Sequence, residues 1–232
     1  MINELRKELK KLSNKDRAVQ SARYFKTGKG EYGEGDVFIG LNLVDVTQLA
    51  KKYKDLTFPE LQELLNSKIH EERTLALFVL KKRFEKETLK QKQIYEFYLK
   101  NTRNINNWDL VDISAPRIVG GYLIDKPKDI LFKLVRSKSI WERRIAVLSS
   151  FYFIKMGEYD ISLKLAEILL SDREDLIQKA VGWMLREVGK RNLEAEENFL
   201  RKHHKEIGRT AFRYAIEKFP EEKRLKYLMG EI

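Results

Sequence analysis

Residues 106–112 read Asn-Asn-Trp-Asp-Leu-Val-Asp, and the apolar pair Leu110-Val111 inside this segment decides the fold. Similar pairs recur at steps of 35 residues, at Leu75-Ala76, Ile145-Ala146, Ala180-Val181 and Ala215-Ile216. A helix pair that repeats at about this length is typical of an α-solenoid. Amphipathic helices can align by chance, but five aligned windows, each preceded by a second, shorter helix, favour a true repeat.

Helical periodicity extends over almost the whole chain, which is rich in Lys, Glu and Leu and contains only 4 Pro. We expect an all-α, HEAT-like helical-repeat solenoid (an α-α superhelix) with a concave basic face, because no TPR consensus is present. A single domain over 1–232 is predicted, with N-terminal helices and a Gly-rich loop in 1–42 and stacked helix pairs in 43–230. The predicted helices are 2–13, 15–26, 44–55, 58–67, 70–86, 88–103, 107–124, 127–137, 139–156, 160–171, 173–190, 193–206 and 209–228.

The composition argues against several classes of protein. The chain has no cysteine, which excludes disulfides and thiolate metal sites. No metal or other cofactor is expected, since His70, His203 and His204 do not form a plausible ligand set. The sequence does not start as a signal peptide does, and no apolar run approaches the roughly 20 residues of a membrane span. We therefore expect a soluble, cytoplasmic monomer without a membrane partner.

Positive charge predominates, with 46 Lys and Arg against 35 Asp and Glu and a net charge of +11. Such a surplus indicates a polyanionic partner such as nucleic acid, although lysine-rich helices can also simply be soluble. In a solenoid, residues at equivalent repeat positions line up along the concave face. The position before each apolar pair reads Thr74, Asp109, Arg144, Lys179 and Tyr214, and with the neighbouring Arg143 the predicted face is mostly basic, with one acidic repeat in the middle. This column predicts a groove for a nucleic-acid backbone with a carboxylate directed into it.

Residues 28–35 form a Gly-rich segment, Gly-Lys-Gly-Glu-Tyr-Gly-Glu-Gly, that matches G-x-G-x-x-G. A dinucleotide site requires a strand before this motif and a helix directly after it. Here a predicted helix precedes the motif, so a flexible loop with positive-φ glycines is the better interpretation. Lys29 at the loop tip can reach a phosphate.

Trp108 and Asp112 are four residues apart and therefore share one helix face. Asp109 lies in the first turn of the predicted helix, where capping and the helix dipole account for an acid. Asp112 is one turn deeper, where a capping role fits poorly. It either serves the function of the protein or forms an ion pair with an arginine of the next repeat, such as Arg144.

The sequence resembles the bacterial DNA alkylation repair protein family, the AlkD-like alkylpurine DNA glycosylases. The resemblance rests on segments 22–26, 36–40, 107–112, 140–144 and 178–187, which occur in the family's order and spacing. It implies a HEAT-like solenoid that hydrolyses the N-glycosidic bond of N3- and N7-alkylated purines in double-stranded DNA, without a deep base-flipping pocket. The Gly-rich loop is longer than in the best-understood branch. Some related branches bind DNA without excising bases, so a non-catalytic DNA or RNA binder and a protein-interaction scaffold stay open.

The resemblance also implies roles for individual residues. Asp112 matches the catalytic acid, and Trp108 and Trp183 match the active-site tryptophans, although core packing would also explain a helical tryptophan. Arg144 matches a phosphate-contacting arginine, and Tyr24 matches a tyrosine near the lesion. Other cations predicted to neutralise phosphates, unless they only form a solvated helix face, are Arg143, Lys179, Arg117 and Arg186.

Overall fold

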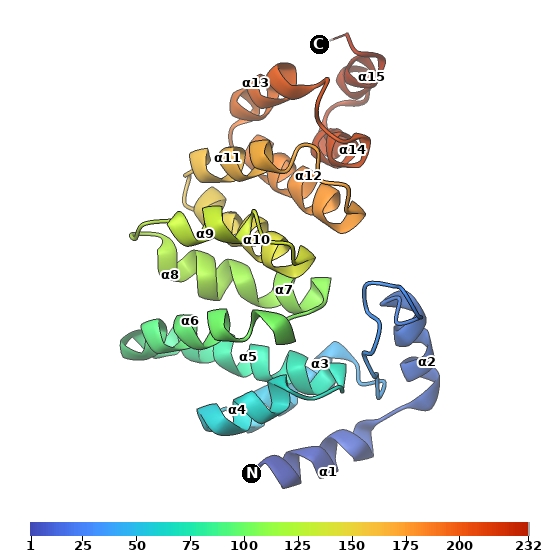
Figure 1. Cartoon of the computed structure of the whole chain (residues 1–232), viewed down its shortest axis with the longest axis vertical. Coiled ribbons are helices and arrows are strands. Elements are labelled where there is room, and N and C mark those ends of the chain that lie inside the picture. The colour runs from blue at the N-terminus through green and yellow to red at the C-terminus, as the bar shows by residue number, and fades with distance from the viewer. Residues whose placement is uncertain (232) are drawn as a thin grey trace. The chain divides into compact units, whose positions relative to one another are not determined.

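A computed structural model of the protein describes residues 1–231, which are helical along most of their length (Figure 1). Within this range the only strand-like pairing is an isolated parallel bridge between Val37 and Ile69. The all-α prediction is confirmed. No helix in these residues combines the length and the apolar composition needed to cross a bilayer. The chain divides into two compact units, Met1–Ser114 and a second that begins at Ala115.

The first unit is built around α5, a helix that is buried on nearly every side. Helices α3 and α4 pack against it, and α6 follows it in the chain. Side-chain caps stabilise the N-termini of two shorter helices. The Asn14 side chain caps α2, and Thr57 forms a capping box with Glu60 at α4. The elements are α1 (Ile2–Leu12), α2 (Lys15–Tyr24), α3 (Leu43–Lys52), α4 (Phe58–Leu65), α5 (His70–Lys86), a 3-10 turn (Thr88–Lys90), α6 (Gln91–Lys100), a second 3-10 turn (Thr102–Asn104) and α7 (Trp108–Ala115).

The second unit is a ladder of helices in which α10 packs against α12 and α12 against α14 (Figure 1). A second row contacts this ladder, because α9 and α11 pack on α10, while α11 and α13 pack on α12. The elements are a π-helical turn (Pro116–Gly120), α8 (Gly121–Leu123), α9 (Asp129–Leu134), α10 (Ile140–Lys155), α11 (Asp160–Ile168), α12 (Asp175–Gly189), α13 (Leu193–His203), α14 (Arg209–Ala215), a 3-10 turn (Ile216–Lys218) and α15 (Glu221–Met229).

The two apolar columns of the 35-residue repeat form part of the core. All ten side chains have an exposed fraction of 0%. Burying an apolar side chain of this kind stabilises a fold by roughly 1.5–3 kcal/mol for the larger residues, so the same two helix positions carry the packing in successive repeats. These residues are Leu75, Ala76, Leu110, Val111, Ile145, Ala146, Ala180, Val181, Ala215 and Ile216.

Some predicted helices are shorter than expected. The predicted helix 209–228 is interrupted, since α14 ends at Ala215 and α15 begins only at Glu221. Pro220 explains the break, because a proline disfavours helical backbone in the residue before it, and Phe219 is extended at φ −66° and ψ 149°. The predicted helix 88–103 is likewise reduced to α6 between two 3-10 turns.

Gly182 allows α12 to approach α14 closely. A Cβ added there would overlap the carbonyl oxygen of Ala211 and lie 2.5 Å from Cβ of Tyr214. We expect Gly182→Ala to lower the free energy of unfolding by about 2 kcal/mol, because overpacking costs more than the roughly 1 kcal/mol that alanine gains in helix propensity. Urea unfolding followed by circular dichroism measures the change.

Gly28→Ala is the control for Gly182→Ala, since its Cβ would meet only the flexible Glu31 carboxylate. It should change the free energy of unfolding by a few tenths of a kcal/mol. Equal stability of the two variants would contradict the close approach of α12 and α14.

Candidate functional site

A recess of about 360 Å³ opens in the unit Met1–Ser114. Trp108 and Asp112, the pair predicted to share a helix face, both line it from α7. Its walls combine an apolar surface with several ionisable groups, which is the usual make-up of a ligand site. The other lining residues are Ser21, Phe25, Phe38, Leu41, Leu43, Val46, His70, Glu71, Thr74, Asp109 and Ile113.

Trp108 is held by aromatic side chains from the end of α2 and the segment after it. Its indole stacks on Phe25 at a centroid distance of 5.3 Å and an interplanar angle of 19°. The Tyr24 ring meets it edge-on at 5.9 Å. Phe25 in turn stacks on Phe38 at 4.9 Å, and Phe38 stacks on His70 at 4.5 Å. Tyr24 is 66% exposed, so much of its ring is open to solvent beside Trp108.

The Gly-rich loop folds back onto this aromatic cluster. Gly30 and Gly35 have φ values of 80° and 90°, as expected for a turn that only glycine adopts readily. The Tyr32 hydroxyl lies 3.5 Å from the Tyr24 carbonyl oxygen, to which it donates, and it is hydrogen-bonded to Trp108. Burial raises the pKa of Tyr32. The loop therefore contributes a contact to the site, beyond the exposed cation Lys29.

A buried charged network centred on His70 lies beside the stack. His70 Nδ1 is 3.0 Å from Asp36 Oδ2, and His70 Nε2 is 2.8 Å from Asp109 Oδ2. A carboxylate only accepts hydrogen bonds, so the two contacts together are satisfied by a ring that donates from both nitrogens, as an imidazolium does. Arg73 Nη2 donates to Asp36 Oδ1 at 2.6 Å, and Asn107 Nδ2 donates to Asp36 Oδ2 at 3.2 Å. The two carboxylates thus lie on either side of the ring, while Arg73 Nε and Asp109 Oδ1 are buried without a hydrogen-bond partner.

The pKa values of this network follow from its geometry. Burial lowers the pKa of His70, but the hydrogen bonds to Asp109 and Asp36 outweigh it and raise that pKa overall. Burial raises the pKa of Asp36, but the His70 hydrogen bond and the Arg73 charge outweigh it, and the net shift is downward. Within residues 1–231, no trio of His, Asp or Glu side chains is arranged to hold a metal ion.

Asp109 has a role that its position in the sequence does not reveal. It does lie in the first turn of α7, yet its carboxylate binds His70, a residue 39 positions away. The backbone N–H of Trp108 instead donates to Asn107 Oδ1 at 2.8 Å. The interpretation of Asp109 as a helix-start acid was therefore incomplete, because the partner lies far away in the chain.

In the second unit, two of the predicted residues lie against neighbouring helices. Trp183 is partly buried on α12, with its ring centroid 5.7 Å from that of Phe151. Arg144 is only 5% exposed, and its Nη1 donates to the Leu176 carbonyl oxygen at 2.5 Å. Trp183 of α12 and Arg144 of α10 are thus each held by a contact with a neighbouring helix.

The other cations of the second unit that are predicted to contact phosphate all have partners within that unit. Arg143 pairs with Asp172 at 2.8 Å, and Lys179 pairs with Asp175 at 2.8 Å. Arg186 forms an ion pair with Glu217, and Arg117 lies over the Tyr152 ring at 5.6 Å. Lys179 is 40% exposed, against 14% for Arg143 and 16% for Arg186. Lys179 is therefore the most accessible of these three cations.

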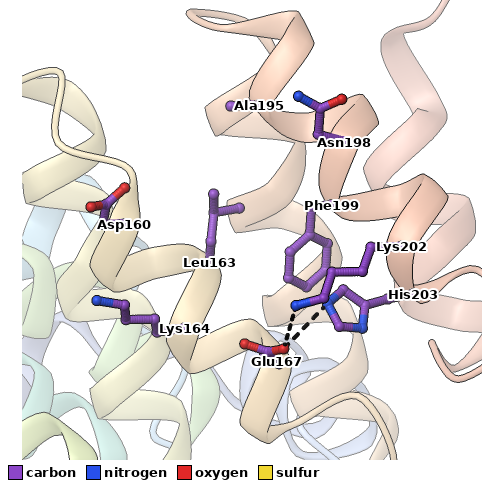
Figure 2. A pocket seen from close by; sticks show the side chains of 9 residues that line it. All are labelled: Asp160, Leu163, Lys164, Glu167, Ala195, Asn198, Phe199, Lys202 and His203. Atoms are coloured by element: carbon purple, nitrogen blue, oxygen red, sulfur yellow. Dashed lines mark hydrogen bonds and ion pairs between the residues drawn. The ribbon is translucent and has the colours of Figure 1, made fainter.

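A second recess, of about 460 Å³, lies between α11 and α13. Figure 2 shows Lys202 and His203 turned towards Glu167, which they contact at 3.0 and 3.5 Å. None of the residues predicted for function lines this recess. The recess beside Trp108, which two of the predicted residues line, is therefore the better candidate.

The fold and the recess indicate the class of protein. The stacked helix pairs place the chain among helical-repeat proteins, and a tryptophan and a carboxylate on one helix line a candidate site. The chain belongs to the DNA alkylation repair enzyme family, whose model matches residues 5–219. The resemblance inferred from the sequence is therefore confirmed. No curated protein matches the sequence.

Solved structures share the fold. A predicted DNA alkylation repair enzyme from Enterococcus faecalis is 17% identical, with a TM-score of 0.69 over 90% of this chain and 97% of that one. AlkD2 from Streptococcus mutans is 18% identical, with a TM-score of 0.58 over 89% and 99%. The smu.31 protein from Streptococcus mutans UA159 is 18% identical, with a TM-score of 0.56 over 95% and 99%.

Proposed function

We propose that this protein is a monofunctional DNA glycosylase that hydrolyses the N-glycosidic bond of cationic N3- and N7-alkylated purines in double-stranded DNA. The observation that carries the proposal is the recess in which Trp108 and Asp112 lie side by side, in a member of the DNA alkylation repair enzyme family. The protein would act on DNA as a cytoplasmic monomer, without a cofactor and without a deep pocket for a flipped base.

The chemistry of an alkylated purine explains why so few groups suffice. The base is already cationic and leaves readily, while the sugar passes towards an oxocarbenium ion, as in glycoside hydrolysis. Asp112 would stabilise this cation electrostatically and position or activate the attacking water. Trp108 and Trp183 would add cation–π attraction of about 0.5–2 kcal/mol towards the sugar and the cationic base.

Asp112 is a better candidate for the acid than its neighbour Asp109. Asp112 lies on the Trp108 face of α7 and matches the catalytic acid of the family to which the chain belongs, whereas the Asp109 carboxylate contacts His70 at the start of α7. Among the described residues that line the recess there is no lysine, so a Schiff-base lyase route has no amine there. The expected products are a free base and an abasic site.

Base release from methylated DNA is the decisive experiment. Purified protein is incubated with double-stranded DNA treated with a methylating agent, and free 7-methylguanine and 3-methyladenine are measured by mass spectrometry. Abasic sites should appear in equal amounts, without strand cleavage. Tight DNA binding with no released base would instead indicate a non-catalytic DNA binder, and no salt-sensitive DNA binding would indicate a protein-interaction scaffold.

DNA affinity should depend on salt through the proposed phosphate contacts Lys29, Arg117, Arg143, Arg144, Lys179 and Arg186. Each phosphate that a cation neutralises contributes about −0.9 to the slope of log affinity against log salt concentration. We expect Lys179→Ala to reduce the magnitude of this slope by about one, as measured by fluorescence anisotropy between roughly 50 and 200 mM salt.

The matched control for Lys179→Ala is Lys202→Ala. Lys202 is likewise paired with a carboxylate, at 3.0 Å from Glu167, but it lies on α13 beside the second recess. Its loss should leave the salt slope unchanged. Equal slopes for the two variants would remove Lys179 from the set of phosphate contacts.

A further inference from the structure

We propose that protonated His70 is a positioning residue for the recess, holding the first turn of α7 in place through the carboxylate of Asp109. The inference rests on the proposed function for what the recess does, and on the contacts of the first unit for how it is held. It assigns a role to the Asp36–His70–Asp109 network, a chain of two carboxylates joined by one buried imidazolium.

The network reaches α7 at two points. His70 is the first residue of α5, its side chain is 3% exposed, and it binds Asp109 on one side and Asp36 on the other. Asp36 is fixed by Arg73 and by the Nδ2 atom of Asn107. The Oδ1 atom of Asn107 accepts from the backbone N–H of Trp108. One buried cluster therefore holds both a side chain and a backbone amide at the start of α7.

Fixing this turn orients the two residues proposed to act on DNA. Trp108 and Asp112 are both on α7, so the direction of its first turn sets where both side chains lie in the recess. The aromatic stack also helps to orient Trp108. The His70 ring stacks on Phe38, and Phe38 stacks on Phe25. Phe25 in turn stacks on the Trp108 indole. A cationic ring on Phe38 also gains cation–π attraction.

The contacts that hold the first turn of α7 depend on the protonation of His70. The charged groups facing the ring are Asp36 from the segment before α3, Arg73 from α5 and Asp109 from α7. A neutral imidazole has one donor, so after proton loss one of the two carboxylate contacts must break. Burial lowers the pKa of His70, but the hydrogen bonds to Asp109 and Asp36 outweigh it and raise that pKa overall, so the stabilisation is complete below its ordinary pKa and is lost as pH rises through the raised value.

Nitrogen NMR of the wild-type protein without DNA tests the protonation state directly. At pH 7, both nitrogens of His70 should carry a proton, and the His70 pKa should lie above its ordinary value. Trp108 fluorescence should change with the same midpoint, because the stack and the start of α7 loosen together. A neutral His70 with one bare ring nitrogen at pH 7 would overturn the proposal, whatever the activity of the protein.

The role in catalysis is tested with His70→Gln, which removes the charge and leaves one amide donor. We expect single-turnover release of 7-methylguanine to fall about 10–100-fold, as displacement of a reacting group by about 1 Å does, with DNA affinity within about threefold of wild type. The release rate of the wild-type protein should decline as pH rises through the raised pKa of His70. This decline should be absent in His70→Gln. The double variant His70→Gln/Asp109→Asn also lacks the carboxylate that His70→Gln leaves uncompensated. It should release base at least about threefold faster than His70→Gln alone.

The matched control is His203→Gln, which changes a histidine that is also buried and also beside a glutamate, on α13. It should leave the rate and the pH profile unchanged. Wild-type release by folded His70→Gln would overturn the positioning role. A wild-type protein that releases no base would overturn the proposed function, while the NMR and fluorescence measurements would still decide whether His70 holds α7.

Discussion

Asp112→Asn should lower single-turnover release of 7-methylguanine by at least about 100-fold, because removal of one preorganised group that stabilises developing charge costs about 10²–10³ in rate. Asparagine preserves the shape of the side chain but not its negative charge, and the oxocarbenium ion then loses its electrostatic partner. DNA affinity should stay within about threefold of wild type, since base pairs and phosphates are bound by other residues. Release of free base under enzyme excess measures the rate, and fluorescence anisotropy measures the affinity.

The control for Asp112→Asn is Asp129→Asn, which removes an equal charge from the exposed first turn of α9. It should release base at the wild-type rate, so that a general change in net charge is ruled out. Release by Asp112→Asn within about threefold of wild type would show that Asp112 is not the acid, and base release would then require another carboxylate of the recess, Asp109 or Glu71.

Most of the fold could be predicted because repeat packing leaves a periodic trace in the sequence. The two apolar columns are fully buried in every repeat, since each helix pair must cover its neighbour with the same positions. The boundaries were harder to predict, because a local break decides them. Phe219-Pro220 splits the last predicted helix, although the apolar pattern on both sides of it continues.

The site could be predicted only where its residues share one helix. Trp108 and Asp112 are four residues apart on α7, and the structure places both in the recess. His70 was missed because its partners Asp36 and Asp109 are 34 and 39 residues away. Phe25 and Phe38 lie in segments that resemble the family, yet only the tertiary fold shows that they support Trp108.

The predicted cations show a different limit of sequence reasoning. A basic residue in the right column can face a phosphate or a neighbouring carboxylate, and the spacing is the same for both. Arg143 and Arg186 are mostly buried and each pairs with an acid on a later element, Asp172 and Glu217. Charge counting alone therefore overstates how many basic side chains are exposed to a partner.

The second large effect concerns stability and a buried acid outside the recess, Glu196. This side chain of α13 is 2% exposed and fits against Gly189 of α12, where a Cβ would overlap its carboxylate. Burial raises the pKa of Glu196 to about 8, and the neighbouring Glu197 charge adds to the shift. Its Oε1 atom has no hydrogen-bond partner. We therefore expect the folded protein to hold this carboxyl mainly in its neutral form at pH 7.

The sign of the pH dependence follows from this raised pKa. Between the ordinary value of 4.5 and about 8, the folded state keeps a proton that the unfolded state releases, so stability falls as pH rises. Glu196→Gln keeps a neutral side chain at every pH and removes this dependence. We expect the free energy of unfolding of the variant, relative to wild type, to rise by about 1.4 kcal/mol per pH unit between pH 5 and 8.

Urea unfolding of both proteins across this pH range measures the difference, and Glu194→Gln provides the control. Glu194 lies in the first turn of the same helix but is exposed, so its charge is solvated in both the folded and the unfolded state. The difference between Glu194→Gln and wild type should therefore stay flat with pH. A flat difference for Glu196→Gln as well would mean that Glu196 is ionised in the folded protein. The space left by Gly189 would then have to admit water or a cation to the carboxylate, because an ionised carboxyl without a partner is too costly to bury.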